Sequence, residues 1–224
     1  MPWARKNRGT DATLETFQPN LDLFGQEAQL ITVKPETDMF IQTESTPNPA
    51  TLKFLPGRAV MSTGTADFPS EDAAQASPLA QRVFSAGGVS GVFFGPDFIT
   101  VTKADDAEWS HIKPGILGAI MEHFQSGLPV LEGEVGAVGH AEHDGPDAEI
   151  VVQIKELLDT RVRPAVAQDG GDITFHGFDR GVVYLHMQGA CAGCPSSTMT
   201  LKMGIENLLR HYIPEVTEVR PVAA

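Results

Sequence analysis

The chain has 224 residues, of which 42% are hydrophobic, and its 29 acidic side chains outnumber 16 basic ones to give a formal charge of −13. This length allows one large or two small domains with ordinary cores, and no apolar run approaches the roughly 18 residues of a membrane span, so we expect a soluble protein without a membrane partner. The negative charge would repel a phosphate backbone, which argues against nucleic acid as a partner.

Residues 1–38 show no sustained helical or strand periodicity and contain glycine and proline at scattered positions. We interpret them as a disordered or loosely docked extension. The first 20 residues have no apolar central region and contain acidic residues early, so they fit neither a secretory signal nor a transit peptide. From this composition we predict a cytoplasmic location.

Residues 39–126 have the pattern of a compact α+β domain. MFIQTE and ATLKFLP read as two short strands on either side of a proline-rich turn, and VSGVFFG and DFITVTK read as a hairpin. Between these pairs, Ser77 and Pro78 form a typical helix start, with the serine as N-cap. A second helix follows from Glu108 to Gln125, because isoleucine or phenylalanine recurs there at every fourth position: Ile112, Ile116, Ile120 and Phe124.

Residues 127–146 are rich in glycine and acids and contain no lysine or arginine, which predicts a self-repelling linker. Residues 147–224 then read as helix, strand, strand, helix, strand, with DITFHGF and GVVYLHM as the hairpin. Pro214 ends the last helix, and EVTEVRPV is the closing strand. The predicted fold class is therefore α+β, with two small α+β domains joined by an acidic, Gly-rich linker.

Both cysteines of the chain lie in one short stretch, GACAGCPSS, as Cys191 and Cys194. The order of elements places them on the turn between the second hairpin strand and the last helix, with Pro195 in the first helical turn. We expect backbone amides and the positive end of this helix to face the sulfurs and to lower the thiol pKa. The small residues around them, such as Ala192 and Gly193, predict an accessible loop suited to thiolate exchange.

Thiolate selects zinc, cuprous copper or the iron of iron–sulfur clusters, and zinc and cluster sites both require four ligands. This chain supplies two sulfurs. Three solutions remain open from the residues alone: histidines complete a site within one chain, two chains each donate a cysteine pair, or the pair forms a reversible disulfide.

Two longer segments resemble a known family. DTRVRPAVAQDGGDITF followed by GVVYLHMQGACAGCPSSTMTLKMGIENLLR resembles the carboxy-terminal domain of Nfu-type iron–sulfur cluster scaffold and carrier proteins, also called the NifU carboxy-terminal-like domain. MFIQTESTPNPATLKFLPG with SPLAQRVFSAGGVSGVFFGPDFITVTK resembles their amino-terminal domain. The resemblance covers residues 39–224, so residues 1–38, which match neither domain, are either an extension or a mis-called start.

The resemblance implies that the protein is not an enzyme but a scaffold or carrier. A 4Fe-4S cluster would bridge two chains in a homodimer or higher oligomer, with Cys191 and Cys194 of each as ligands. Upstream assembly machinery would supply the cluster, and apo iron–sulfur proteins would receive it. Two rival functions use the same cysteines: a dithiol oxidoreductase, whose C-x-x-C also begins a helix, and a zinc site between two chains.

Other candidate residues have simpler explanations. His140 and His143 form H-x-x-H in the flexible linker, which provides no rigid ligand geometry. His176 and His186 on the second hairpin could complete a zinc site, but ordinary strand histidines explain them. The run from Asp169 to Asp172 is most simply a helix stop and a turn that could position the cysteine loop. Three aromatic residues fit the core of the first domain, and an exposed subset would form a client surface: Phe93, Phe94 and Phe98.

Overall fold

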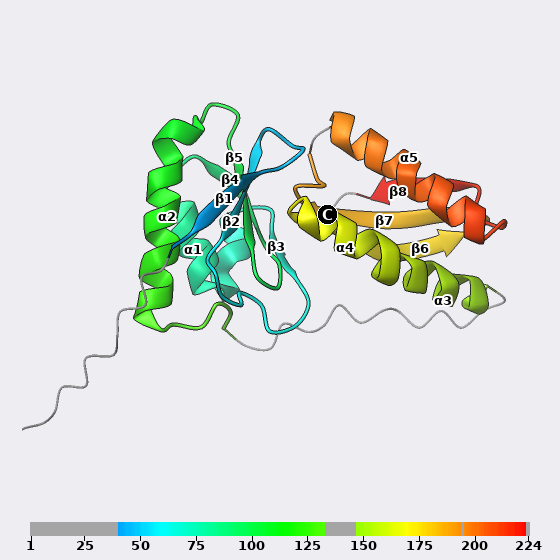
Figure 1. Cartoon of the computed structure of the whole chain (residues 1–224), viewed down its shortest axis with the longest axis horizontal. Helices are drawn as coiled ribbons and strands as arrows, with labels where there is room; N and C mark the ends of the chain where they lie inside the picture. Colours follow the sequence, from blue (N-terminus) through cyan, green and yellow to red (C-terminus); the bar gives the residue numbers. More distant parts are fainter. Residues whose placement is uncertain (1–39, 133–146, 194, 223–224) are drawn as a thin grey trace, which may run out of the picture. The chain divides into compact units, whose positions relative to one another are not determined.

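The computed structural model describes residues 40–132, 147–193 and 195–222, which form two α+β domains, each with one sheet and its own core (Figure 1). The predictions for residues 1–38, for most of the linker with His140 and His143, and for the placement of Cys194 concern residues outside these ranges. The predicted α+β class is confirmed. Within the described ranges, no helix combines the length and the apolarity needed to cross a membrane.

The sheet of the first domain has the strand order β1-β2-β5-β4-β3, and every neighbouring pair is antiparallel. The strands predicted on either side of the proline-rich turn are β1 and β2, and the predicted hairpin is β4 and β5. Strand β3 was not predicted, because three residues are too few to show an alternating pattern. The bounds are β1 Gln42–Ser45, β2 Thr51–Leu55, β3 Ala66–Phe68, β4 Val89–Phe94 and β5 Ile99–Lys103.

Helices α1 (Pro78–Ser85) and α2 (Trp109–Ser126) pack against one face of this sheet, after a short 3₁₀ turn over Asp72–Ala76 (Figure 1). The predicted N-cap is confirmed, since the Ser77 hydroxyl accepts a hydrogen bond from the Ala80 N–H at 3.0 Å. Gly127 ends α2 with a φ of 68°, a left-handed conformation that glycine adopts without strain.

The second domain begins with one helical segment in three parts: α3 (Ala148–Leu157), a π-helical turn (Leu158–Val162) and α4 (Arg163–Gln168). The sequence predicted one helix here with a stop at residues 169–172, but not its division into three parts. Ile154, Leu158, Val162 and Val166 keep a four-residue spacing through all three parts and are all buried, so the apolar pattern gives no sign of the π-helical turn.

The three-stranded sheet of the second domain consists of β6 (Gly171–Asp179), β7 (Val182–Gly189) and β8 (Glu218–Val222). β6 and β7 form the predicted hairpin, and β8 is the predicted closing strand, which pairs with β7 in parallel. α5 (Pro195–Tyr212) joins β7 to β8 and packs on the same core as α3 and α4. The cysteine stretch therefore lies where β7 ends and α5 begins.

Candidate functional site

Cys191 lies in a tight turn directly after β7. Its N–H donates to the Gln188 carbonyl at 3.3 Å, and the Ala192 N–H donates to the Gly189 carbonyl at 3.1 Å, so two overlapping turns reverse the chain here. Gly189 has a φ of 59° and Gly193 a φ of 79°, which explains glycine on both sides of the cysteine. The backbone around Cys191 is thus fixed by local hydrogen bonds.

The predicted low thiol pKa is wrong for Cys191. The amides of residues 191 and 192 already donate to backbone carbonyls, so they do not stabilise a thiolate. The side chain is only 5% exposed, and this burial raises the pKa of the Cys191 thiol to about 12, with smaller contributions from the carboxylates of Asp169 and Asp172. The thiol is therefore protonated at neutral pH, and the prediction of an accessible loop is also wrong for Cys191.

The sulfur of Cys191 packs against the start of β6. A Cβ atom on Gly171 would lie 2.5 Å from Cys191 Sγ and 2.7 Å from the Gln188 carbonyl oxygen, both closer than van der Waals contact allows. Gly171 pairs with Gly189 in the β6–β7 ladder, so the hairpin register brings this glycine under the cysteine. Gly171, within the predicted glycine-rich run from Asp169 to Asp172, therefore leaves room for the Cys191 side chain.

The other end of the turn is connected to α5. The Thr198 hydroxyl in the second turn of this helix donates to the Cys191 carbonyl at 3.2 Å. Helix α5 begins at Pro195, as predicted, so Cys194 occupies the position directly before it in the chain. Gly193 is exposed, in contrast to the buried Cys191. The cysteine turn thus has a buried side at Cys191 and an open side at Gly193.

Asp172 is a buried carboxylate in this region, and Arg163 on α4 binds it with two hydrogen bonds. Arg163 Nε donates to Oδ1 and Nη2 donates to Oδ2, both at 2.8 Å. These bonds raise the pKa of the Arg163 guanidinium above its usual range.

Gly170, which precedes β6, has a φ of 84° and ends α4, so the predicted helix stop is confirmed.

Side chains of the first domain contact the backbone near the cysteine turn, which sequence reasoning missed. Asn48 Nδ2 donates to the Ala192 carbonyl at 3.1 Å, and Thr100 Oγ1 donates to the Gly170 carbonyl at 2.6 Å. The Lys53 ammonium donates to the two last carbonyls of α4 at 3.2 and 3.0 Å, where a cation is favoured. For Lys53 and Thr100 the available signal was a polar residue within a largely apolar strand, whereas Asn48 lies in the turn between β1 and β2.

The remaining candidate residues do not form a site. His176 is exposed and His186 is half-buried, with its pKa lowered by burial and by His176. In the described ranges, which omit Cys194, no three His, Cys, Asp or Glu side chains gather as a metal site. The aromatic residues Phe93, Phe94 and Phe98 are all buried, so none of them forms an exposed client surface. Phe94 belongs to the core of the first domain, whereas Phe93 lies next to Gly189 at the end of β7.

Comparison with known proteins matches both halves of the chain to family models. Residues 41–127 match the amino-terminal domain of the scaffold protein Nfu/NifU, and residues 154–220 match the NifU-like domain. The chain is 50% identical over 216 residues to "NifU-like protein 4, mitochondrial" of Arabidopsis thaliana, which covers 95% of this chain and 75% of that protein. It is 53% identical over 191 residues to the human "NFU1 iron-sulfur cluster scaffold homolog, mitochondrial", which covers 84% of this chain and 74% of that protein.

A solution structure of a NifU-like protein from Saccharomyces cerevisiae is 29% identical to this chain. The match covers 43% of this chain and 87% of that chain, with a TM-score of 0.39.

The names of the relatives bear on the cellular location of the protein. The plant and human proteins are both named mitochondrial, which contradicts the predicted cytoplasmic location. That prediction used only the composition of the first residues, and neither a domain fold nor a cysteine site carries information about a cellular compartment.

Proposed function

The chain belongs to the family of Nfu/NifU-like scaffold proteins, and we propose that it holds a 4Fe-4S cluster as cargo and transfers it to apo-proteins. The human relative is named an iron–sulfur cluster scaffold, which supports this role. Cys191 and Cys194 are the proposed ligands. Because one chain offers two sulfurs and a cluster requires four, one pair from each of two chains completes the shell in a homodimer or higher oligomer.

The observation that carries this proposal is the placement of Cys191 within the NifU-like match. Both cysteines lie inside the matched residues 154–220, and the turn that bears Cys191 is tied to β6, β7 and α5. Thiolate sulfur is the donor that iron–sulfur clusters require. Since Cys191 is protonated at neutral pH when free, cluster uptake would release its proton, and release of the cargo is favoured by reprotonation.

We also propose how the chain divides its tasks. Residues 39–126 form the first domain, residues 127–146 the linker and residues 147–224 the cluster-binding domain, while residues 1–38 contribute to neither. The first domain would contact the assembly machinery that supplies the cluster or the apo-proteins that receive it. No catalytic step is needed, because transfer is an exchange of thiolate ligands.

The rival functions differ from this proposal in what they require of the thiols. A dithiol oxidoreductase needs a reactive, exposed thiolate, whereas burial keeps Cys191 protonated and covered. Zinc held between two chains would use the same four sulfurs, and only the bound metal would differ. Metal analysis therefore separates zinc from the cluster.

The test is anaerobic reconstitution of the full chain with iron and sulfide. We expect four irons and four sulfides per two chains, the broad visible absorption of a 4Fe-4S cluster, and transfer to an apo four-iron enzyme. Cys191→Ala and Cys194→Ala should each abolish uptake, while the matched variants His176→Ala and His186→Ala should leave it unchanged. A monomer that holds a full cluster would contradict the bridging ligand set, and zinc in place of iron and sulfide would support the metal-site alternative.

A further inference from the structure

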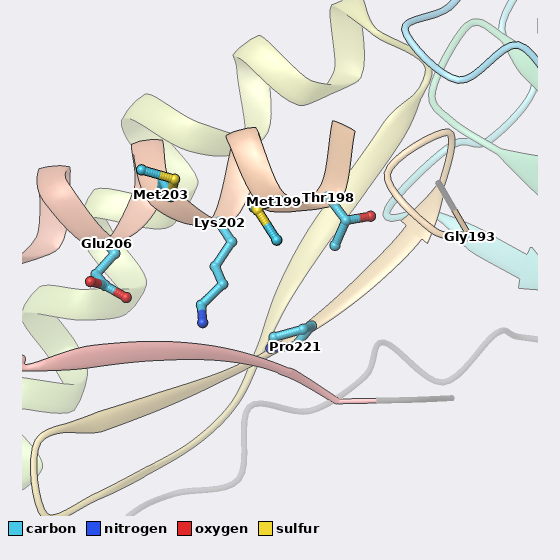
Figure 2. A pocket seen from close by; sticks show the side chains of 7 residues that line it. All are labelled: Gly193, Thr198, Met199, Lys202, Met203, Glu206 and Pro221. Carbon is cyan, nitrogen blue, oxygen red and sulfur yellow. The ribbon is translucent and has the colours of Figure 1, made fainter. Parts of the chain in front are cut away.

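The open side of the cysteine turn continues into a surface groove along α5. This groove has a volume of about 670 Å³ and lies between α5 and β8 (Figure 2). Met199 and Met203, one helical turn apart, line it together with Gly193 of the cysteine turn and Pro221 of β8. The groove therefore begins at the cysteine turn itself.

The two methionines are unusually exposed for apolar side chains. Met199 is 64% and Met203 is 59% exposed, and neither side chain belongs to the core of its own domain. Apolar side chains that gather in a hollow at the surface are typical of a contact with another protein. Methionine is also flexible enough to pack against an irregular partner surface.

We propose that this groove is where a second copy of the chain docks when the two copies share a cluster. The inference deepens the proposed function and rests on it: a chain with two sulfurs is incomplete without a second pair. In a two-fold contact each copy presents the same surface, so the surface next to the cysteine turn of one chain meets its counterpart. The open surface next to this turn is the groove.

Distances along α5 agree with such a contact. Met199 and Met203 follow Pro195, the first residue of α5, by four and eight residues, which correspond to about 6 and 12 Å along a helix axis. A standard interface of about 800 Å² per partner extends roughly 16 Å from its centre if it is circular. A contact centred on the shared cysteines therefore covers both methionines.

The charges in the groove do not oppose the approach of an identical copy. Lys202 and Glu206 both line it, one of each sign. Lys202 Nζ lies 3.9 Å from a Glu218 carboxylate oxygen, and Arg210 Nη1 lies 3.7 Å from Glu206 Oε1. Both charges are thus compensated within the chain. The overall charge of −13 acts against association of two copies, but Lys202 and Glu206 in the groove add no net charge to it.

The test compares Met199→Glu and Met203→Glu with the matched control Val152→Glu in the full chain. Val152 on α3 is 62% exposed, lies in the same domain and does not line the groove. After anaerobic reconstitution, sedimentation velocity measures the dimer, and iron and sulfide analysis measures the cluster. Thermal unfolding of the three apo variants checks that each is folded.

We expect the wild-type chain and Val152→Glu to form loaded dimers, and each methionine variant to dimerise at least about tenfold more weakly with a matching loss of cluster. Methionine variants that dimerise and load as the wild type does would overturn the inference. If they load normally but no longer transfer the cluster, the groove serves clients instead of a second copy, which also overturns it. A wild-type chain that takes up no cluster, or takes one as a monomer, contradicts the proposed function itself.

Discussion

Arg163 holds the buried carboxylate of Asp172 by two parallel hydrogen bonds of 2.8 Å, and so connects α4 to the strand that lies under the cysteine turn. Asp172 pairs with Gln188 in the β6–β7 ladder, and the Gln188 carbonyl accepts the hydrogen bond of the Cys191 N–H. The ion pair therefore stabilises the backbone on which the candidate ligand depends.

Arg163→Met should lower the free energy of unfolding by about 2–4 kcal/mol, because it leaves a buried carboxylate without its charged partner. Urea denaturation followed by circular dichroism measures this. The matched control is Arg180→Met. Arg180 is paired with Asp179 at the surface and its side chain is 91% exposed. The free energy of unfolding of this variant should therefore fall by no more than about 0.5 kcal/mol. Equal losses in the two variants would mean that Asp172 does not need its partner.

Gly171→Ala should displace the Cys191 side chain. The added Cβ would lie 2.5 Å from Cys191 Sγ and 2.7 Å from a backbone oxygen, and such overpacking costs about 1–3 kcal/mol. We expect lower stability and reduced cluster uptake after reconstitution. Gly177→Ala on the same strand is the control, since no atom lies within 4 Å of its Cβ position. A Gly171→Ala protein that is as stable and as well loaded as this control would refute the close packing.

Much of the fold was predictable because its signals are local. Ser77 before Pro78 marks a helix start in any context, and the prediction matched the structure. The π-helical turn over residues 158–162 was not predictable, because the buried apolar residues keep a four-residue spacing through it. The position of Cys191 between β7 and α5 was likewise predictable from the order of elements.

The environment of Cys191 was not predictable, because burial depends on residues distant in the sequence. The prediction of a low pKa treated the helix start as the only influence on the thiol. In the structure the register of β6 and β7 places Gly171 beneath the sulfur, and Asn48 of the first domain contacts the next residue of the turn. No spacing pattern in the sequence reports such contacts, which arise only when the strands have paired.

His123 gives the first domain a defined pH dependence. It is fully buried on α2, and in the described part of the chain neither ring nitrogen has a hydrogen-bond partner. Burial, helped by nearby Arg82, lowers the pKa of His123 below its ordinary value of 6.5. In the unfolded chain it titrates normally, so its contribution to stability is full above pH 6.5 and is lost as the pH falls toward the lower folded pKa.

His123→Met should therefore flatten the loss of stability between pH 7 and pH 5, since the buried group that resists protonation is gone. Urea unfolding at a series of pH values measures this. His111→Gln is the control, because His111 lies on the same helix but is exposed, and the pH profile of that variant should follow the wild type. If His123→Met keeps the wild-type profile, another group is responsible for the acid sensitivity.

Cys191 is buried, so its thiol becomes available only when the region around it opens. Thr100 is 1% exposed, and its hydroxyl donates to the Gly170 carbonyl at 2.6 Å, next to the glycine that packs under the sulfur. Thr100→Val removes this donor, so the Gly170 carbonyl keeps only its hydrogen bond from the Ala190 N–H at 3.1 Å, and the loss of one hydrogen bond costs about 0.5–1.5 kcal/mol. Opening of the region around Cys191 should become easier by a similar amount, and we expect alkylation of its thiol to accelerate by about two- to tenfold.

The measurement uses the Cys194→Ser background, so that iodoacetamide labels only Cys191, and follows the reaction by intact mass at constant pH. Thr102→Val is the matched control, since it makes the same change two residues along β5, outside the contact with Gly170. Its rate should equal that of the parent. If Thr100→Val also labels at the parent rate, the first domain does not restrict access to Cys191, and the burial of that thiol is due to its own domain alone.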